Sequence, residues 1–217
     1  MVPGINDVSS TLTSHMTRHP NAKVASTSVP VHPLLAERWS PRGFDRSHEL
    51  GDEALTALLE AARWAPSSRN SQPWRFLVTR RGEEAHDRLF AALAPGNRAW
   101  AGAASALVLV AARTVGDNGR PQRFALYDTG GAVAALVTQA QADGLAVCQI
   151  GGFDSAAARA EFGLDDTLTP VVVLAIGRHS TADLPEPLAA HDAAPRIRRP
   201  LGDLLLPTRP ELELAAA

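Results

Sequence analysis

One run of residues, Ala65–Phe76, contains most of the groups in this chain that could hold a small polar ligand. Serine, arginine, asparagine and glutamine follow one another between two prolines, and a predicted helix and a predicted strand flank the run. Pro66 ends the helix and Pro73 restricts the backbone at the start of the strand, so the loop between them is stiff. A stiff loop loses little conformational entropy when a ligand binds, which favours a polar binding site here.

A second group of candidate ligand contacts is basic. Arg38, Ser40 and Arg42 occupy alternate positions, and alternate side chains of an extended backbone lie on one side. Pro41 favours that extended conformation at Ser40. Three donors on one side suit a phosphate or another anion, although a solvent-exposed charge pair before a helix has the same pattern. The basic segment Arg196–Pro200 near the other end of the chain could converge on the same anion or form a surface arm.

A pair of glycines follows a predicted strand in the segment Gln149–Asp154. Gly151 and Gly152 would allow backbone N–H groups to approach a planar ligand closely. The alternative interpretation is a tight connection from strand to helix, with Asp154 as the N-cap of the helix.

The composition indicates small-molecule chemistry. The net charge of -2 and the charged fraction of 20% give no electrostatic footprint for nucleic acid or for an acidic membrane surface, so neither is expected as a partner. The Walker, G-x-G-x-x-G, H-E-x-x-H, C-x-x-C and G-x-S-x-G patterns do not occur, which argues against a phosphate loop, a Rossmann site, a metal site or a serine nucleophile. The only cysteine, Cys148, lies in an apolar run and is predicted to be a buried thiol.

The 217 residues are enough for one domain. We expect a flexible tail at residues 1–33, which are rich in Ser, Thr, Pro and His, and a single domain with a C-terminal arm at residues 34–217. The tail lacks the apolar segment of a secretory signal, and no later stretch is long enough to span a bilayer. These features predict a cytoplasmic protein.

Helical and strand periodicities alternate along the domain. Helices are predicted at residues 52–65, 82–93, 124–143 and 155–162, and strands at residues 76–78, 106–111, 146–150 and 169–176. Asp52 is the predicted N-cap of the first helix, and Gly144 is the predicted C-cap of the third. The order of elements favours an α/β or α+β sandwich around one sheet.

Two segments have surfaces that the domain itself does not account for. The helix predicted at residues 124–143 is apolar on most sides, so a sheet on one side and a second subunit on the other would cover it. The chain after Gly177 contains many prolines and is predicted to be loop-like. It resembles an arm that lies on a partner subunit.

Together these motifs resemble the FMN-dependent nitroreductase family, and the match runs in order over about residues 34–202. Gly96-Asn97 and Gly144-Leu145 add to the segments described above. The resemblance implies an α+β fold, with a mixed sheet between helices, that forms an intertwined homodimer with two FMN sites at the interface. In such a homodimer a second subunit would cover the apolar helix, and the proline-rich arm would lie on that subunit.

By this resemblance three groups of residues bind the cofactor FMN. They are Arg38, Ser40, Arg196 and Arg198 at the phosphate, with Arg42 near the pyrimidine edge; Pro66, Ser67, Ser68 and Asn70, reaching the ribityl chain and ring from the other subunit; and the backbone of Gly151 and Gly152 at N5 and O4. No side chain needs to act as an acid or base, because the flavin carries the hydride. Arg42 would stabilise the reduced flavin, whose charge lies near N1 and O2.

The activity implied is that of an oxidoreductase in which NADPH or NADH reduces FMN and leaves, after which a nitroaromatic, quinone or similar acceptor takes the electrons. Two departures from the family pattern bear on this. Ala101 stands where an amide often contacts the flavin, unless Asn97 replaces it, and the connection from Arg113 to Gln122 is too short for a lid helix. FMN fragmentation, reductive dehalogenation and flavin binding without turnover are therefore the alternatives.

Overall fold

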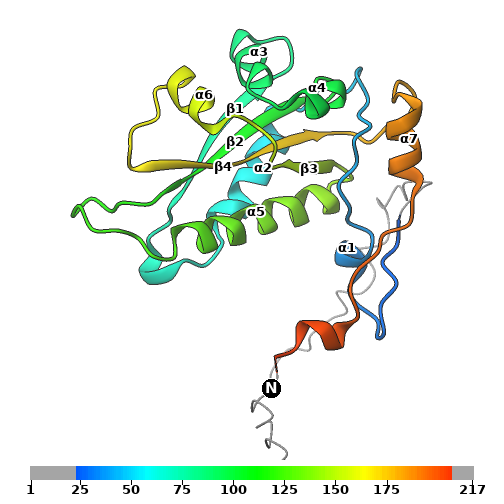
Figure 1. Cartoon of the computed structure of the whole chain (residues 1–217), viewed down its shortest axis with the longest axis horizontal. Helices are drawn as coiled ribbons and strands as arrows, with labels where there is room; N and C mark the ends of the chain where they lie inside the picture. The colour runs from blue at the N-terminus through cyan, green and yellow to red at the C-terminus, as the bar shows by residue number, and fades with distance from the viewer. Residues whose placement is uncertain (1–22, 207–217) are drawn as a thin grey trace, which may run out of the picture.

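A four-stranded sheet lies at the centre of the computed structural model, which describes residues 23–206 (Figure 1). Its strands are β1 (Trp74–Arg80), β2 (Ala106–Arg113), β3 (Ala146–Ile150) and β4 (Leu168–Gly177). Their order is β1-β2-β4-β3, and every neighbouring pair is antiparallel. The α+β class is confirmed, but the sheet of the described residues is not mixed. β2 and β3 run in the same direction, and β4 lies between them.

Helices cover both faces of the sheet. They are α1 (Pro33–Ala36), α2 (Asp52–Arg63), α3 (Glu84–Ala91), α4 (Pro95–Ala101), α5 (Ala125–Ala142), α6 (Ser155–Glu161) and α7 (Glu186–Ala193). α2 and α5 lie on one face, α3, α4 and α6 lie on the other, and α7 stands beside the end of the sheet (Figure 1). Among the described residues, no helix is long and apolar enough to cross a membrane.

Alternation along the strands divides the core into two parts. Val108 and Val110 of β2 pack with Leu136 on the side of α2 and α5. Leu107 and Leu109 pack on the opposite side of the sheet, with the residues of α3 and α4. Because β2 is buried on both faces, both sides of this strand are apolar, as its sequence predicts.

The predicted helices and strands all occur, with shifted ends, but α1, α4 and α7 were not predicted. Pro95 lies two residues after the helix predicted at residues 82–93 and begins α4. Proline is tolerated in the first turn because the N–H that it lacks has no partner there. The same reason allows α7 to begin next to Pro185 and Pro187.

The predicted caps have mixed outcomes. Gly51, and not Asp52, is the N-cap of α2, and Asp52 pairs with Arg80 of β1. Gly144 follows the last turn of α5 with a φ of 70°, which is the conformation that a terminating glycine provides. Asp154 caps α6 as predicted, accepting two backbone N–H bonds.

Candidate functional site

The loop between α2 and β1 has a strained backbone. Arg69, Asn70 and Gln72 have φ values of 55°, 56° and 44°. Arginine and glutamine rarely adopt this left-handed conformation, which costs roughly 1–3 kcal/mol for each such residue. Strain of this kind persists where neighbouring contacts enforce it, and such positions concentrate at binding sites.

Asp128 in the first turn of α5 holds this loop in place. Its carboxylate accepts a hydrogen bond from the backbone N–H of Ser68 at 2.9 Å, and the residue is only 5% exposed. Within the loop, the backbone N–H of Gln72 donates to Ser67 Oγ at 3.0 Å. Asp128 was not among the predicted site residues, although it is the only charged residue of α5, and that isolation distinguishes it in the sequence.

The basic residues from the two ends of the domain come together. Arg38 Nη1 donates to Ser40 Oγ at 3.3 Å, so these side chains share a side, as the alternation predicted. Burial lowers the pKa of the Arg38 guanidinium, and the charges of Arg196 and Arg198 lower it further. The predicted convergence of the two basic segments is therefore present in the structure.

Asp192 of α7 joins these two segments. Its Oδ2 accepts the backbone N–H groups of Arg42 at 2.8 Å and Gly43 at 3.1 Å, and the residue is 5% exposed. Since α7 leads directly to Arg196, this anchor fixes the first basic segment relative to the second. Asp192 was not among the predicted site residues, because the prolines around it are typical of a loop.

Arg196 is held by the backbone near the start of the domain. Its Nη1 donates to the carbonyl oxygens of Lys23 at 2.8 Å and Ala36 at 2.7 Å. Lys23 Nζ in turn donates to the carbonyl of His191 at 3.1 Å. Residues 23–36 thus contact α7 and the segment that follows it. Residues 1–22 of the predicted tail lie outside the described residues, as does the last part of the predicted arm, so the domain boundary stays a prediction.

The arginine group has the character of an anion site. Its members are Arg38, Arg42, Arg196 and Arg198. Within the described range, none of them forms an ion pair with a carboxylate. Like charges held together repel one another, so a bound phosphate would be stabilised there by bidentate, charge-assisted hydrogen bonds.

Cys148 lies on β3 beside this group and is 7% exposed. Burial raises the pKa of its thiol to about 11, against the opposing effect of the nearby Arg42 and Arg38 charges. The prediction of a buried thiol is confirmed. The neutral thiol form therefore prevails throughout the physiological pH range, and the side chain packs in the core with α6 and β4.

We expect Cys148 to react slowly with a thiol reagent in the native protein. With a pKa of about 11, its thiolate fraction at pH 8 is roughly two orders of magnitude below that of a free cysteine. The release of thionitrobenzoate from DTNB measures this rate, and the same protein in guanidinium chloride supplies the reference. Equal rates in the two conditions would contradict the burial of this thiol.

The glycine pair lies between β3 and α6, and contacts with α4 fix it. Asn97 Nδ2 donates to the carbonyl of Gly152 at 2.9 Å, and the backbone N–H of Ala94 donates to the same oxygen at 3.0 Å. A Cβ at Gly152 would lie 2.7 Å from Asn97 Nδ2, so a side chain at this position would displace the Asn97 amide. Ala101 is fully buried, and the Asn97 amide is directed at Gly152.

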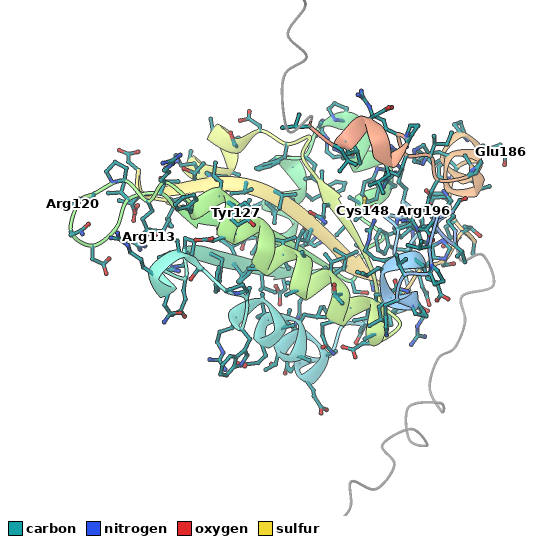
Figure 2. All side chains as sticks on the ribbon, turned by 90° about the horizontal axis from the view of Figure 1, so that it is seen from below. Arg113, Arg120, Tyr127, Cys148, Glu186 and Arg196 are labelled. Atoms are coloured by element: carbon teal, nitrogen blue, oxygen red, sulfur yellow. The ribbon has the colours of Figure 1, made fainter. Side chains whose placement is uncertain are left out.

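Two sets of candidate contacts, the strained loop and the arginine group, lie at opposite ends of α5. The 18-residue helix is about 27 Å long. The strained loop lies at its first turn, and the arginine group lies near its last turn. The glycine pair lies between these ends, because it follows Ile150, which pairs with Val173 in the middle of β4. Figure 2 shows Arg120, near the strained loop, and Arg196 at opposite ends of the molecule. One small ligand cannot contact both sets in one chain.

Comparison with known proteins identifies the family to which most of the domain is similar. A model of the nitroreductase family matches residues 35–99 and 91–178. The chain is also 28% identical over 211 residues to the oxygen-insensitive NAD(P)H nitroreductase of Salmonella typhimurium, in a match that covers 77% of this chain and 94% of that protein.

Solved structures give the same result. A structure described as an oxidoreductase containing FMN has a TM-score of 0.79 and 33% sequence identity, with 85% of this chain and 94% of that chain covered. A nitroreductase family protein from Clostridium difficile has a TM-score of 0.65 and 25% identity, covering 83% of this chain and 99% of that one. Both are similar over nearly the whole length of the described domain.

Proposed function

This chain belongs to the nitroreductase family and is an NAD(P)H-dependent FMN oxidoreductase; we propose that it reduces nitroaromatics, quinones or similar electron-poor acceptors. The observation that carries the proposal is the unpaired arginine group, which fits a phosphate monoester such as that of FMN. The substrate class comes from the relatives and is the part of the proposal that needs an experiment.

We assign FMN contacts to the residues of the two sets. Arg38, Ser40, Arg196 and Arg198 would bind the phosphate through charge-assisted hydrogen bonds. Arg42 follows Ser40 by two residues, and its cation would stabilise negative charge on the pyrimidine edge of the flavin. Gly151 and Gly152 have no side chain that would keep a planar ligand away, so their backbone would be able to approach the ring.

FMN, when bound, supplies the hydride chemistry, by accepting a hydride from NAD(P)H and passing electrons to the second substrate. The residues of this chain would bind and orient it. Asp192 fixes the backbone at Arg42, and Asp128 fixes the loop that contains Ser67, Ser68 and Asn70. No side chain near either set is required to transfer a proton.

The separation of the two sets supports a homodimeric site. The loop of Pro66, Ser67, Ser68 and Asn70 and the arginine group lie at opposite ends of α5, which is about 27 Å long. The loop would therefore contact the FMN held by the arginines of the partner. Each site would then contain residues of both chains.

The exposed face of α5 also supports association with a second copy. Asp128 is the only charged residue of the helix, and it is buried. The residues exposed on the opposite side include Leu126 and Tyr127, which are 54% and 81% exposed. A long uncharged helix face on the surface of a monomer is unusual and indicates a contact surface.

Anaerobic reduction tests the function. NADH or NADPH is added to the FMN-loaded protein while the absorption band of oxidised flavin is monitored. Rapid bleaching, with recovery when a nitroaromatic or a quinone is added, is the expected result. If neither nicotinamide bleaches the band, the protein performs another flavin chemistry, such as FMN fragmentation or dehalogenation, or only binds flavin.

Mixed dimers test whether both chains form each site. One chain carries Arg38→Ala, and the other carries Asn70→Gly, which removes the amide without opposing the positive φ. If each site uses both chains, one site of the mixed dimer has both substitutions and the other has neither. Half of the sites should then bind FMN with the unsubstituted affinity. If a single chain formed each site, every site would be impaired.

A further inference from the structure

A cavity of about 570 Å³ lies between the strained loop and the hairpin that follows β2. The hairpin covers residues 114–122 and is closed by pairing between Val115 and Pro121. The first turn of α5 forms a third wall of the cavity. Figure 2 shows Arg113 and Arg120 at this end of the molecule, far from Arg196.

Three arginines line this cavity: Arg69 from the strained loop, Arg120 from the hairpin, and Arg123 from the start of α5. Each of them is exposed. None forms an ion pair with a carboxylate of residues 23–206. Their guanidinium groups therefore remain available to an anion.

The two carboxylates that line the cavity do not neutralise these arginines. Asp128 is buried and accepts the N–H of Ser68. The Asp117 side chain is fully exposed and lies 3.9 Å from Arg113 Nη1, its nearest basic partner. The wall formed by the three arginines is consequently cationic, and an anionic ligand is favoured there.

An aromatic ring adds a second feature that a nucleotide would use. Phe124 lines the cavity and is 47% exposed. The guanidinium carbon of Arg123 lies 5.4 Å from the centre of its ring. A cation next to an accessible ring face is suited to a molecule that has both a phosphate and a planar base.

We propose that this cavity binds the phosphate-bearing part of the nicotinamide donor. The inference rests on the proposed function, because only in the homodimer does the strained loop lie beside a flavin. A donor whose nicotinamide contacts that flavin would extend its phosphates toward Arg69, Arg120 and Arg123. Either the diphosphate or the 2′-phosphate of NADPH has the required chemistry.

The test uses the FMN-loaded protein with the double substitution Arg120→Ala and Arg123→Ala. A protein with Arg46→Ala and Arg98→Ala, which removes two exposed arginines away from this cavity, is the matched control. Dissociation constants for NADPH and NADH come from anaerobic stopped-flow bleaching. Calorimetric binding of 2′,5′-ADP and of 5′-AMP measures the same site without turnover.

We expect the double variant to bind NADPH and 2′,5′-ADP at least about tenfold more weakly, since it loses two charged hydrogen-bond donors, while FMN affinity is unchanged. A greater loss for NADPH than for NADH supports the site and assigns it to the 2′-phosphate. Equal losses support the site and assign it to the diphosphate. Unchanged affinity for both donors, with bleaching intact, overturns the inference.

Failure of the proposed function gives a different result. In that case neither nicotinamide bleaches the flavin of the unsubstituted protein. Weakened binding of 2′,5′-ADP to the double variant would still support a phosphate site in the cavity. The site alone would be contradicted by a different combination of results. In that case the unsubstituted protein binds neither 2′,5′-ADP nor 5′-AMP, while the nicotinamides bleach the flavin of the unsubstituted protein and of the variants equally.

Discussion

Arg38→Ala is expected to weaken FMN binding roughly ten- to a hundredfold. The guanidinium of Arg38 shares the anion site with Arg196 and Arg198, and burial, followed by these two charges, lowers its pKa. In the proposed complex it would donate to a phosphate, and loss of one hydrogen bond to a charged group costs about 1.5–3 kcal/mol. Quenching of flavin fluorescence during titration of the apoprotein measures the dissociation constant.

Two further variants separate this effect from a general loss of charge. Arg46→Ala removes an exposed arginine from the same stretch of chain and should leave FMN affinity nearly unchanged. Arg38→Lys keeps the charge but loses the planar fork, so its affinity should be intermediate. If Arg38→Ala retained FMN as well as Arg46→Ala does, the phosphate would have to bind elsewhere.

The local chemistry of the domain could largely be predicted from sequence. Pro66 and Pro73, the alternation of Arg38 and Ser40, and the apolar run around Cys148 each act over a few residues, and the structure has the expected local arrangement. Strand and helix periodicity carries equally local information. α4 was missed because a proline is common both just after the end of a helix and in the first turn of a helix, and Pro95 occupies both places.

The parts that sequence reasoning missed depend on contacts between distant residues. Asp192 binds the backbone at Arg42 and Gly43, 150 and 149 positions away, and Asp128 binds Ser68, 60 positions away. A buried carboxylate that accepts backbone N–H groups has no short motif. The placement of β4 between β2 and β3 is also a tertiary outcome, since sequence alone predicts strands but not their neighbours.

Gly43→Ala is expected to destabilise the domain by about 3 kcal/mol, toward the upper end of the range for an overpacked core. A Cβ at this position would lie 2.1 Å from the carbonyl oxygen of Ser180, and a backbone carbonyl cannot rotate away as a side chain can. The Gly43 N–H also donates to Asp192, and its carbonyl accepts from the Ser180 N–H at 3.3 Å. Relief of the clash must therefore disturb the chain that carries Arg42.

Urea unfolding of Gly43→Ala and of Gly96→Ala makes this a matched comparison. A Cβ at Gly96 meets nothing within 4 Å, and in a helix alanine is favoured over glycine by roughly 0.5–1 kcal/mol, so this control should be slightly stabilised. Since Asp192 connects Gly43 to the helix before Arg196, the Gly43→Ala protein should also bind FMN more weakly under conditions where it is folded. Normal FMN affinity in a destabilised Gly43→Ala protein would mean that the arginine group keeps its arrangement without this anchor.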